Sequence, residues 1–146
     1  MQKTLRPVLF TFFIMVSITM YAQPMNDNCT DAIAIGEVID YAFSSEMATT
    51  DGPNHPNDCI SGGTTPDSVY NDIWYSYSPT FTGWAEWSLC GTATFDTKII
   101  VYNAGATCPL SDSDLYECNE DFTGCAGATS EVVFEVTMGE SYLLRI

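Results

Sequence analysis

The sequence predicts an all-β protein, an antiparallel β-sandwich cross-linked by disulfides. Three observations support this prediction. Short apolar runs rich in β-branched and aromatic residues recur along the chain, and Gly, Pro, Asn and Asp clusters separate them. Amphipathic segments long enough for a helix are scarce, and only residues 31–35 could begin a helical turn. Finally, the six cysteines all follow an export signal.

The export signal occupies residues 1–22. Lys3 and Arg6 form a short basic lead, residues 7–20 are almost wholly apolar, and Ala22 offers a small residue at the expected cleavage site. A membrane span would need about 20 apolar residues, so a cleaved signal is favoured over a retained anchor. Residues 23–146 then form one β-sandwich domain, because this length allows one ordinary domain and not two.

The expected strands follow one another from residue 38 onwards. The clearest period of two lies in residues 131–137, where Val132, Phe134 and Val136 face inward. The same alternation in residues 84–89 places Trp84 and Trp87 on opposite faces. The expected strands are residues 38–43, 73–77, 84–89, 98–102, 131–137 and 142–146.

Two further features are a long irregular stretch and the position at which the sequence ends. Residues 50–67 form the longest irregular stretch, which is typical of a functional or mobile loop. The sequence ends at Ile146 inside an expected strand, so we expect a longer protein in which this domain is truncated at its C-terminal side and lacks its last strand or strands.

The charge balance argues against two classes of partner, nucleic acids and anionic membranes. The whole chain has 19 acidic and 4 basic residues, and removal of the signal leaves only Lys98 and Arg145 as basic residues. Nucleic acids and anionic membranes are bound through clustered Lys and Arg. We therefore expect neither a nucleic-acid partner nor a membrane partner after signal cleavage.

The cysteines predict three disulfides, since an even number in an exported chain is typical of a disulfide framework. A zinc site is disfavoured, because no Cys-x-x-Cys pair is present and His55 is the only histidine. Many connectivities are compatible with the sequence alone, so the pairing stays open at this point. The six residues are Cys29, Cys59, Cys90, Cys108, Cys118 and Cys125.

Several segments in order resemble a family of secreted bacterial domains. They are residues 26–33, 48–52, 72–77, 90–91, 95–99, 101–102, 118–121 and 139–146. Together they are similar to the pre-peptidase C-terminal-like domains of Bacteroidetes-type bacteria, from about residue 26 to the end. The resemblance implies a jelly-roll-like sandwich without catalytic activity. It also implies attachment to secreted proteases, other hydrolases or adhesins, often exported by type IX secretion.

The same resemblance implies a disulfide pairing. In such domains the counterparts of Cys108 and Cys118 tend to occur together, as do those of Cys90 and Cys125. The implied pairs are therefore Cys29–Cys59, Cys90–Cys125 and Cys108–Cys118.

The sequence offers few residues that could act together in catalysis. His55, flanked by Asn54 and Pro56, is expected to be a solvated loop histidine, and no Gly-x-Ser-x-Gly elbow is present. Two facing carboxylates could hydrolyse a glycosidic bond, but a solvated acidic surface explains the same residues.

Calcium is the cofactor that the acidic residues favour, because hard cations bind carboxylate, amide and carbonyl oxygens. If the strand after Asp96 pairs with residues 115–118, Asp96 lies near Asn119 and Asp121, while Asp51 precedes a glycine in a separate turn. We expect these four residues to be the candidate Ca²⁺ ligands. Side-chain turns made by Asp and Asn are the alternative.

The aromatic residues suggest a binding surface, since Trp and Tyr stack on sugars and anchor protein interfaces. Trp84 and Trp74 are the candidate ligand-binding residues, although such rings can equally fill the core. We expect a secreted or cell-surface, non-catalytic binding or adhesion module. It would contact glycan or protein surfaces and the other domains of its own longer chain. A disulfide-stabilised structural spacer is the alternative, and a small secreted hydrolase is less favoured.

Overall fold

The computed structural model describes residues 22–55, 59 and 69–146. Within these ranges the chain is all-β, with two single turns of 3-10 helix and no α-helix. The elements are η1 (Cys29–Asp31), β1 (Ile33–Ile35), β2 (Trp74–Tyr77), β3 (Gly83–Ser88), β4 (Ile99–Tyr102), η2 (Asp112–Asp114), β5 (Leu115–Asn119), β6 (Glu131–Val136) and β7 (Tyr142–Arg145).

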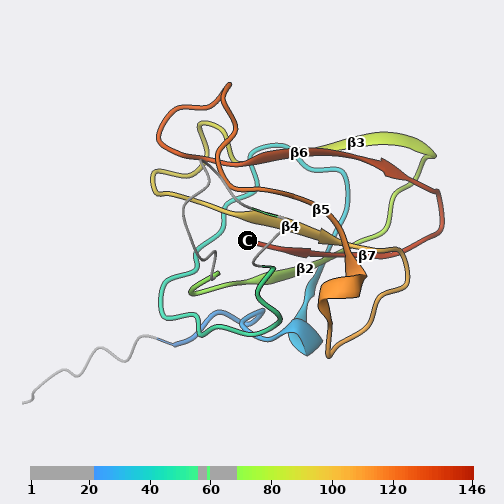
Figure 1. Ribbon diagram of the computed structural model, residues 1–146, viewed down its shortest axis with the longest axis horizontal. Helices are drawn as coiled ribbons and strands as arrows, with labels where there is room; N and C mark the ends of the chain where they lie inside the picture. Colours follow the sequence, from blue (N-terminus) through green and yellow to red (C-terminus); the bar gives the residue numbers. More distant parts are fainter. Residues whose placement is uncertain (1–21, 56–58, 60–68) are drawn as a thin grey trace, which may run out of the picture.

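The strands form two sheets, one of five strands in the order β1-β2-β7-β4-β5 and one of the two strands β3 and β6. Figure 1 shows β5, β4, β7 and β2 side by side in that order. Strand β2 pairs with β7, β3 with β6 and β4 with β5, all antiparallel. Strand β1 is the exception, because it joins β2 in parallel. The pair β4–β5 thus lies within β3–β6 in chain order, and β3–β6 lies within β2–β7. This nesting is that of one long hairpin folded over on itself, as in a jelly roll.

The predicted alternation of side chains is confirmed in the strands that face the other sheet. Val132, Phe134 and Val136 of β6 are buried, and Ala85 of β3 is buried while Trp84 is exposed. The core between the sheets consists of Ala48, Ile73, Tyr75, Tyr77, Ala85, Leu89, Ile99, Val101, Val132, Phe134, Val136, Tyr142, Leu144 and Ile146.

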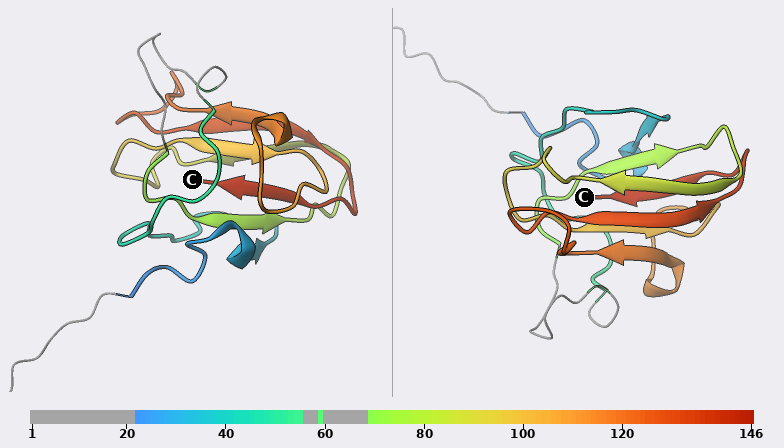
Figure 2. Two further views of the ribbon diagram at one scale, coloured as in Figure 1. Left: turned by 60° about the horizontal axis from the view of Figure 1, so that its bottom comes forward. Right: turned by 90° about the horizontal axis from the view of Figure 1, so that it is seen from above.

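The five-stranded sheet is also buried on its outer face, where loops cover it in place of a third sheet. The left view of Figure 2 shows the segment around residues 50–55, in green, crossing this face. Gly52 has a φ of +99°, and a Cβ atom there would lie 2.8 Å from the Trp74 ring, so only glycine allows this close approach. The second cluster consists of Cys29, Cys59, Val69, Trp74, Ile100 and Tyr102.

A buried ion pair lies against Trp74 of this second cluster. Arg145 donates from Nε to the Asp72 carboxylate, and both side chains are fully buried. Arg145 also donates to the Pro53 carbonyl oxygen at 2.7 Å and lies over the Trp74 ring, 5.2 Å from its centroid. The other carboxylate oxygen of Asp72 accepts the backbone N–H of Asp51 at 2.9 Å. The pair therefore joins the sheet to the segment that covers it.

All six cysteines form disulfides, but two of the three pairs implied by the family resemblance are wrong. The structure pairs Cys29 with Cys108 and Cys59 with Cys118, and it confirms only Cys90–Cys125. The physical reason is the set of loops that covers the outer face of the five-stranded sheet, which we call the covering layer. Both corrected bridges attach this layer to the β4–β5 hairpin. A pairing of neighbours along the chain would leave that cover unattached.

Two local predictions also differ from the structure. Residues 38–43 form no strand, since Asp40 adopts a φ of +55°, which an extended strand does not allow. Residues 31–35 do not begin a helix beyond one turn, because the chain turns at Ala32 and β1 pairs with β2.

We expect removal of the Cys29–Cys108 bridge to lower the free energy of unfolding by about 4.5 kcal/mol in the chain-entropy model. The bridge closes a loop with a sequence separation of 79 residues. Denaturant unfolding of the Cys29→Ala, Cys108→Ala double variant measures this change. Mass spectrometry of a non-reducing digest checks the pairing, and peptides linking Cys29 to Cys59 would contradict it.

We expect Arg145→Met to destabilise the fold by about 3–5 kcal/mol, because it leaves the Asp72 carboxylate buried without its partner. The double variant Asp72→Asn, Arg145→Met should lose less stability than Arg145→Met alone, since Asn can still accept the Asp51 N–H. Denaturant unfolding of Asp72→Asn, of Arg145→Met and of the double variant tests the coupling. Additive losses would show that the ion pair does not act as a unit.

Candidate functional site

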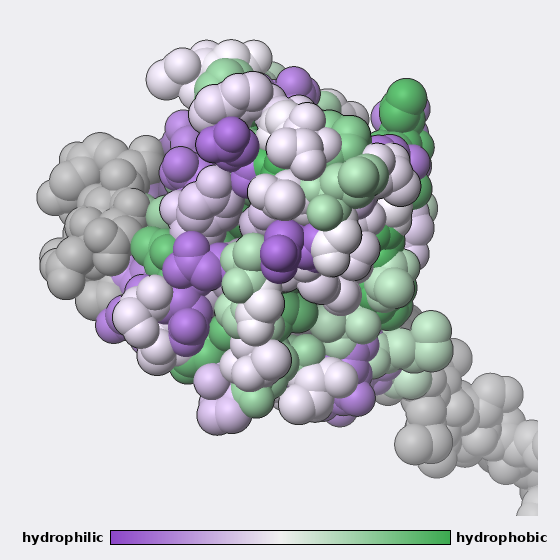
Figure 3. Space-filling model, turned by 90° about the vertical axis from the view of Figure 1, so that its right-hand side faces the viewer, coloured by the Kyte–Doolittle hydropathy of each residue, from purple (hydrophilic) through white to green (hydrophobic). Residues whose placement is uncertain are grey.

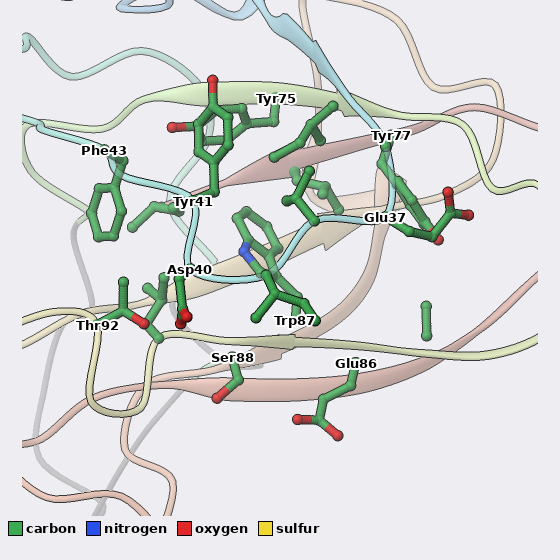
Figure 4. Close-up of a pocket in the computed structure, with 18 of the residues that line it drawn as sticks. Glu37, Asp40, Tyr41, Phe43, Tyr75, Tyr77, Glu86, Trp87, Ser88 and Thr92 are labelled. Atoms are coloured by element: carbon green, nitrogen blue, oxygen red, sulfur yellow. The ribbon is translucent and has the colours of Figure 1, made fainter.

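A groove opens between β3 and the segment of residues 36–43. Its volume is about 580 Å³. Figure 4 shows Trp87 rising from β3 toward this segment, with Glu86 and Ser88 on the opposite side of the strand. We call this feature the aromatic groove. It is lined by residues 35–41, Phe43, Tyr75, Tyr77, Phe81, residues 84–90, Thr92, Phe134, Leu144 and Ile146.

The floor of the groove is made of aromatic rings in edge-to-face contact. Tyr75 of β2 meets Trp87 of β3 with ring centroids 6.2 Å apart, and it meets Tyr41 at 5.9 Å. Tyr75 is buried and Trp87 is half-buried, whereas 42% of Tyr41 is exposed. Such rings offer flat apolar surfaces at the base with an exposed ring above them, an arrangement that can hold a sugar ring or an apolar side chain.

One wall of the groove is fixed by a carboxylate. Glu37 accepts hydrogen bonds from the backbone N–H and the hydroxyl of Thr80, at 3.0 and 3.1 Å. The Thr80 N–H is the main reason that the pKa of Glu37 lies below its ordinary value. The wall is thus tied to the β2–β3 connection, and it keeps its negative charge. Asp40 and Glu86 add further carboxylates among the lining residues.

The two predicted ligand-binding tryptophans differ in their placement. Trp84 is 70% exposed and is one of the groove-lining residues, so it can contact a ligand. Trp74 is fully buried, which makes it wrong as a surface ligand contact. It stacks on Tyr102 with centroids 5.6 Å apart. Residues 73–77 were predicted as a strand, but nothing in that stretch indicates that loops bury its outer face.

His55 is also placed differently from the prediction. It is only 1% exposed, because the covering segment turns it onto the sheet. Its Nε2 lies 3.3 Å from the Tyr102 hydroxyl, and its Nδ1 lies 3.4 Å from a carboxylate oxygen of Asp112. The imidazole packs against Tyr102 of the second cluster, with ring centroids 5.6 Å apart.

The four candidate calcium ligands have different surroundings. Pairing of β4 with β5 is confirmed, with Ile99 opposite Asn119. Asn119 accepts the Glu131 N–H at 3.2 Å, however, and Asp51 accepts the Cys29 N–H at 2.7 Å in the covering layer. Asp96 lies with Glu120 beside a separate hollow of about 260 Å³, and Asp121 is exposed.

Among the described residues, the one group of three close potential metal ligands is Cys90, Cys125 and Glu131. The two sulfur atoms are already joined to each other in a disulfide, so they are not available as thiolates. This group therefore gives no metal site in the oxidised protein.

At the end of the molecule shown in Figure 3, where the β2–β3 and β6–β7 connections lie, hydrophilic and hydrophobic residues are interspersed. No helix in the described ranges is long and apolar enough to cross a bilayer. Three disulfides are typical of an oxidising extracellular environment.

We expect the free energy of unfolding to fall between about pH 10 and about pH 12 because of Tyr102. Burial is the main cause that raises its pKa from 10.0 to about 12. The unfolded state therefore loses the proton first, and stability decreases as the pH rises, by up to about 3 kcal/mol. Denaturant unfolding across this range should give a shallower decline for Tyr102→Phe. Parallel profiles for the two proteins would contradict this assignment.

Comparisons with protein-family models, with characterised proteins and with solved structures find no match to this chain. The resemblance to pre-peptidase C-terminal-like domains therefore stays a prediction.

Proposed function

We propose that this chain is a non-catalytic extracellular binding or adhesion module, and that the aromatic groove is its binding site. The observation that carries the proposal is the groove itself. It combines a floor of aromatic rings, an exposed Trp84 and a carboxylate-bearing wall in one concave feature. Concave sites with aromatic surfaces and a few fixed polar groups are the usual form of binding sites.

The described chemistry favours binding over turnover. Nucleophilic catalysis needs a base that reaches both the nucleophile and the substrate. His55 is the only imidazole in the sequence, and it is enclosed by Tyr102 and Asp112. The groove offers carboxylates, but Glu37 is held by Thr80 with a lowered pKa, which is unfavourable for a general acid.

We also propose that the module is exported and forms part of a longer protein. The leader at residues 1–22 and the family resemblance support a module that is secreted or held at the cell surface as part of a longer protein. Its role there would be to bring that protein to a glycan or protein surface.

A structural spacer is the second candidate, and the covering layer favours it. Two disulfides and a buried ion pair hold this layer on the sheet, which gives a rigid body without requiring any ligand. Ligand binding in the groove distinguishes the two functions.

A screen of glycans and extracellular matrix proteins against the purified chain tests the proposal. We expect binding that falls about tenfold or more in Trp84→Ala and in Tyr41→Ala, as for aromatic residues at the centre of a binding site. Tyr70→Ala is the matched control, because Tyr70 is 74% exposed and does not line the groove. Absence of any groove-dependent ligand would favour the spacer, and turnover of a polysaccharide or peptide would favour an enzyme.

A further inference from the structure

One edge of β3 pairs with β6, and the other edge is open. The backbone N–H of Leu89 donates to the Ser130 carbonyl, so these two residues form a hydrogen-bonded pair at 3.0 Å. The β3–β6 register continues from this pair without a shift. Because hydrogen-bonded and non-hydrogen-bonded pairs alternate in an antiparallel ladder, the backbone groups of Trp84, Glu86 and Ser88 point away from β6.

These backbone groups have no partner among the described residues. The two-stranded sheet ends at β3, and no hydrogen bond joins the backbone of Trp84, Glu86 or Ser88 to another described segment. Residues 84–90 line the aromatic groove consecutively, so this strand edge runs along the groove. An unpaired edge of this kind is a template for another strand.

At the other edge of the same sheet, which is formed by β6, backbone groups do have hydrogen-bond partners. The Glu131 N–H donates to Asn119 Oδ1 at 3.2 Å, and the Glu135 carbonyl accepts the Tyr116 hydroxyl at 3.1 Å. Side chains of β5 thus satisfy backbone groups of β6 at that edge. Residues 36–43 face the edge of β3 across the groove, but they form no strand with it.

We propose that the aromatic groove binds an extended polypeptide segment of another protein, which pairs with β3 as an added strand. This inference rests on the proposed function and specifies its ligand. A polypeptide fits because its alternating N–H and C=O groups match the free groups of the β3 edge. A glycan has no such repeating backbone pattern, and it would leave these groups to water.

The groove also specifies the side chains of the segment. In an added strand, successive side chains alternate between the two faces of the sheet. One set would meet the floor made by Tyr75 and Trp87, which favours apolar residues. The other set would lie on the face that bears Trp84 and Glu86, close to a strongly acidic surface, which favours Lys or Arg.

Selection from a displayed library of random octapeptides tests the inference with the full oxidised chain. We expect enriched sequences in which apolar residues alternate with Lys or Arg. The best peptide is then synthesised with N-methyl groups on either its odd or its even residues. One set should abolish binding and the other should change affinity by less than about threefold, since only one set of N–H groups faces β3. No enrichment, or equal effects of both sets, would overturn the inference.

Two measurements on the protein support the same conclusion independently of the library. Hydrogen exchange of the Glu86 amide should slow about tenfold or more in the complex, whereas that of Ala85, already paired with β6, should change little. Glu86→Lys should weaken the selected basic peptide about fivefold. Glu140→Lys, with the same charge change in the β6–β7 turn outside the groove, should weaken it less. Unchanged exchange at Glu86 would contradict strand pairing.

The glycan screen separates the failure of this inference from the failure of the proposed function. Glycan binding that is lost in Tyr41→Ala, without any peptide selected, would overturn the inference and leave the binding module in place. If neither peptides nor glycans nor matrix proteins bind the groove, both proposals fall.

Discussion

The structure depends on the burial of both faces of the five-stranded sheet when only one of them is covered by another sheet. Strands β3 and β6 cover one face, and irregular segments cover the other. Loops bury backbone groups poorly, so a loop cover needs anchors stronger than hydrophobic contact alone. The Asp72–Arg145 ion pair and the bridges Cys29–Cys108 and Cys59–Cys118 are these anchors.

The difference in width between the two sheets also produces the aromatic groove. A two-stranded sheet is too narrow to cover five strands, so the floor beside β3 is left to Tyr75, Trp87 and the segment of residues 36–43. Since Asp40 interrupts that segment, it borders the groove without closing the edge of β3. The aromatic groove and the free backbone groups of β3 therefore occur together for a reason that lies in the architecture.

The periodicity of the sequence was sufficient to predict most strands and the inward faces of β3 and β6. Apolar alternation reports which side chains meet the opposite sheet, and Val132, Phe134 and Val136 lie where it places them. The exposure of Trp84 follows from the same pattern. These predictions succeed because the interaction they concern is local to each strand.

The outer layer could not be predicted in this way. Trp74, Arg145 and His55 are buried by segments distant in the chain, and no local pattern shows that a loop will cover them. The cysteine pairing failed for the same reason, because it is decided by which loop crosses which hairpin. The groove arises from two separate segments and from an unpaired strand edge, neither of which has a signature in the sequence.

The two bridges of the covering layer have a mechanical consequence for a protein that would hold on to a surface. They attach Cys29 and Cys59 covalently to the β4–β5 hairpin, which lies in the same sheet as β2 and β7. A tensile load entering near Cys29 can pass through sulfur bonds into the hairpin instead of peeling the cover away.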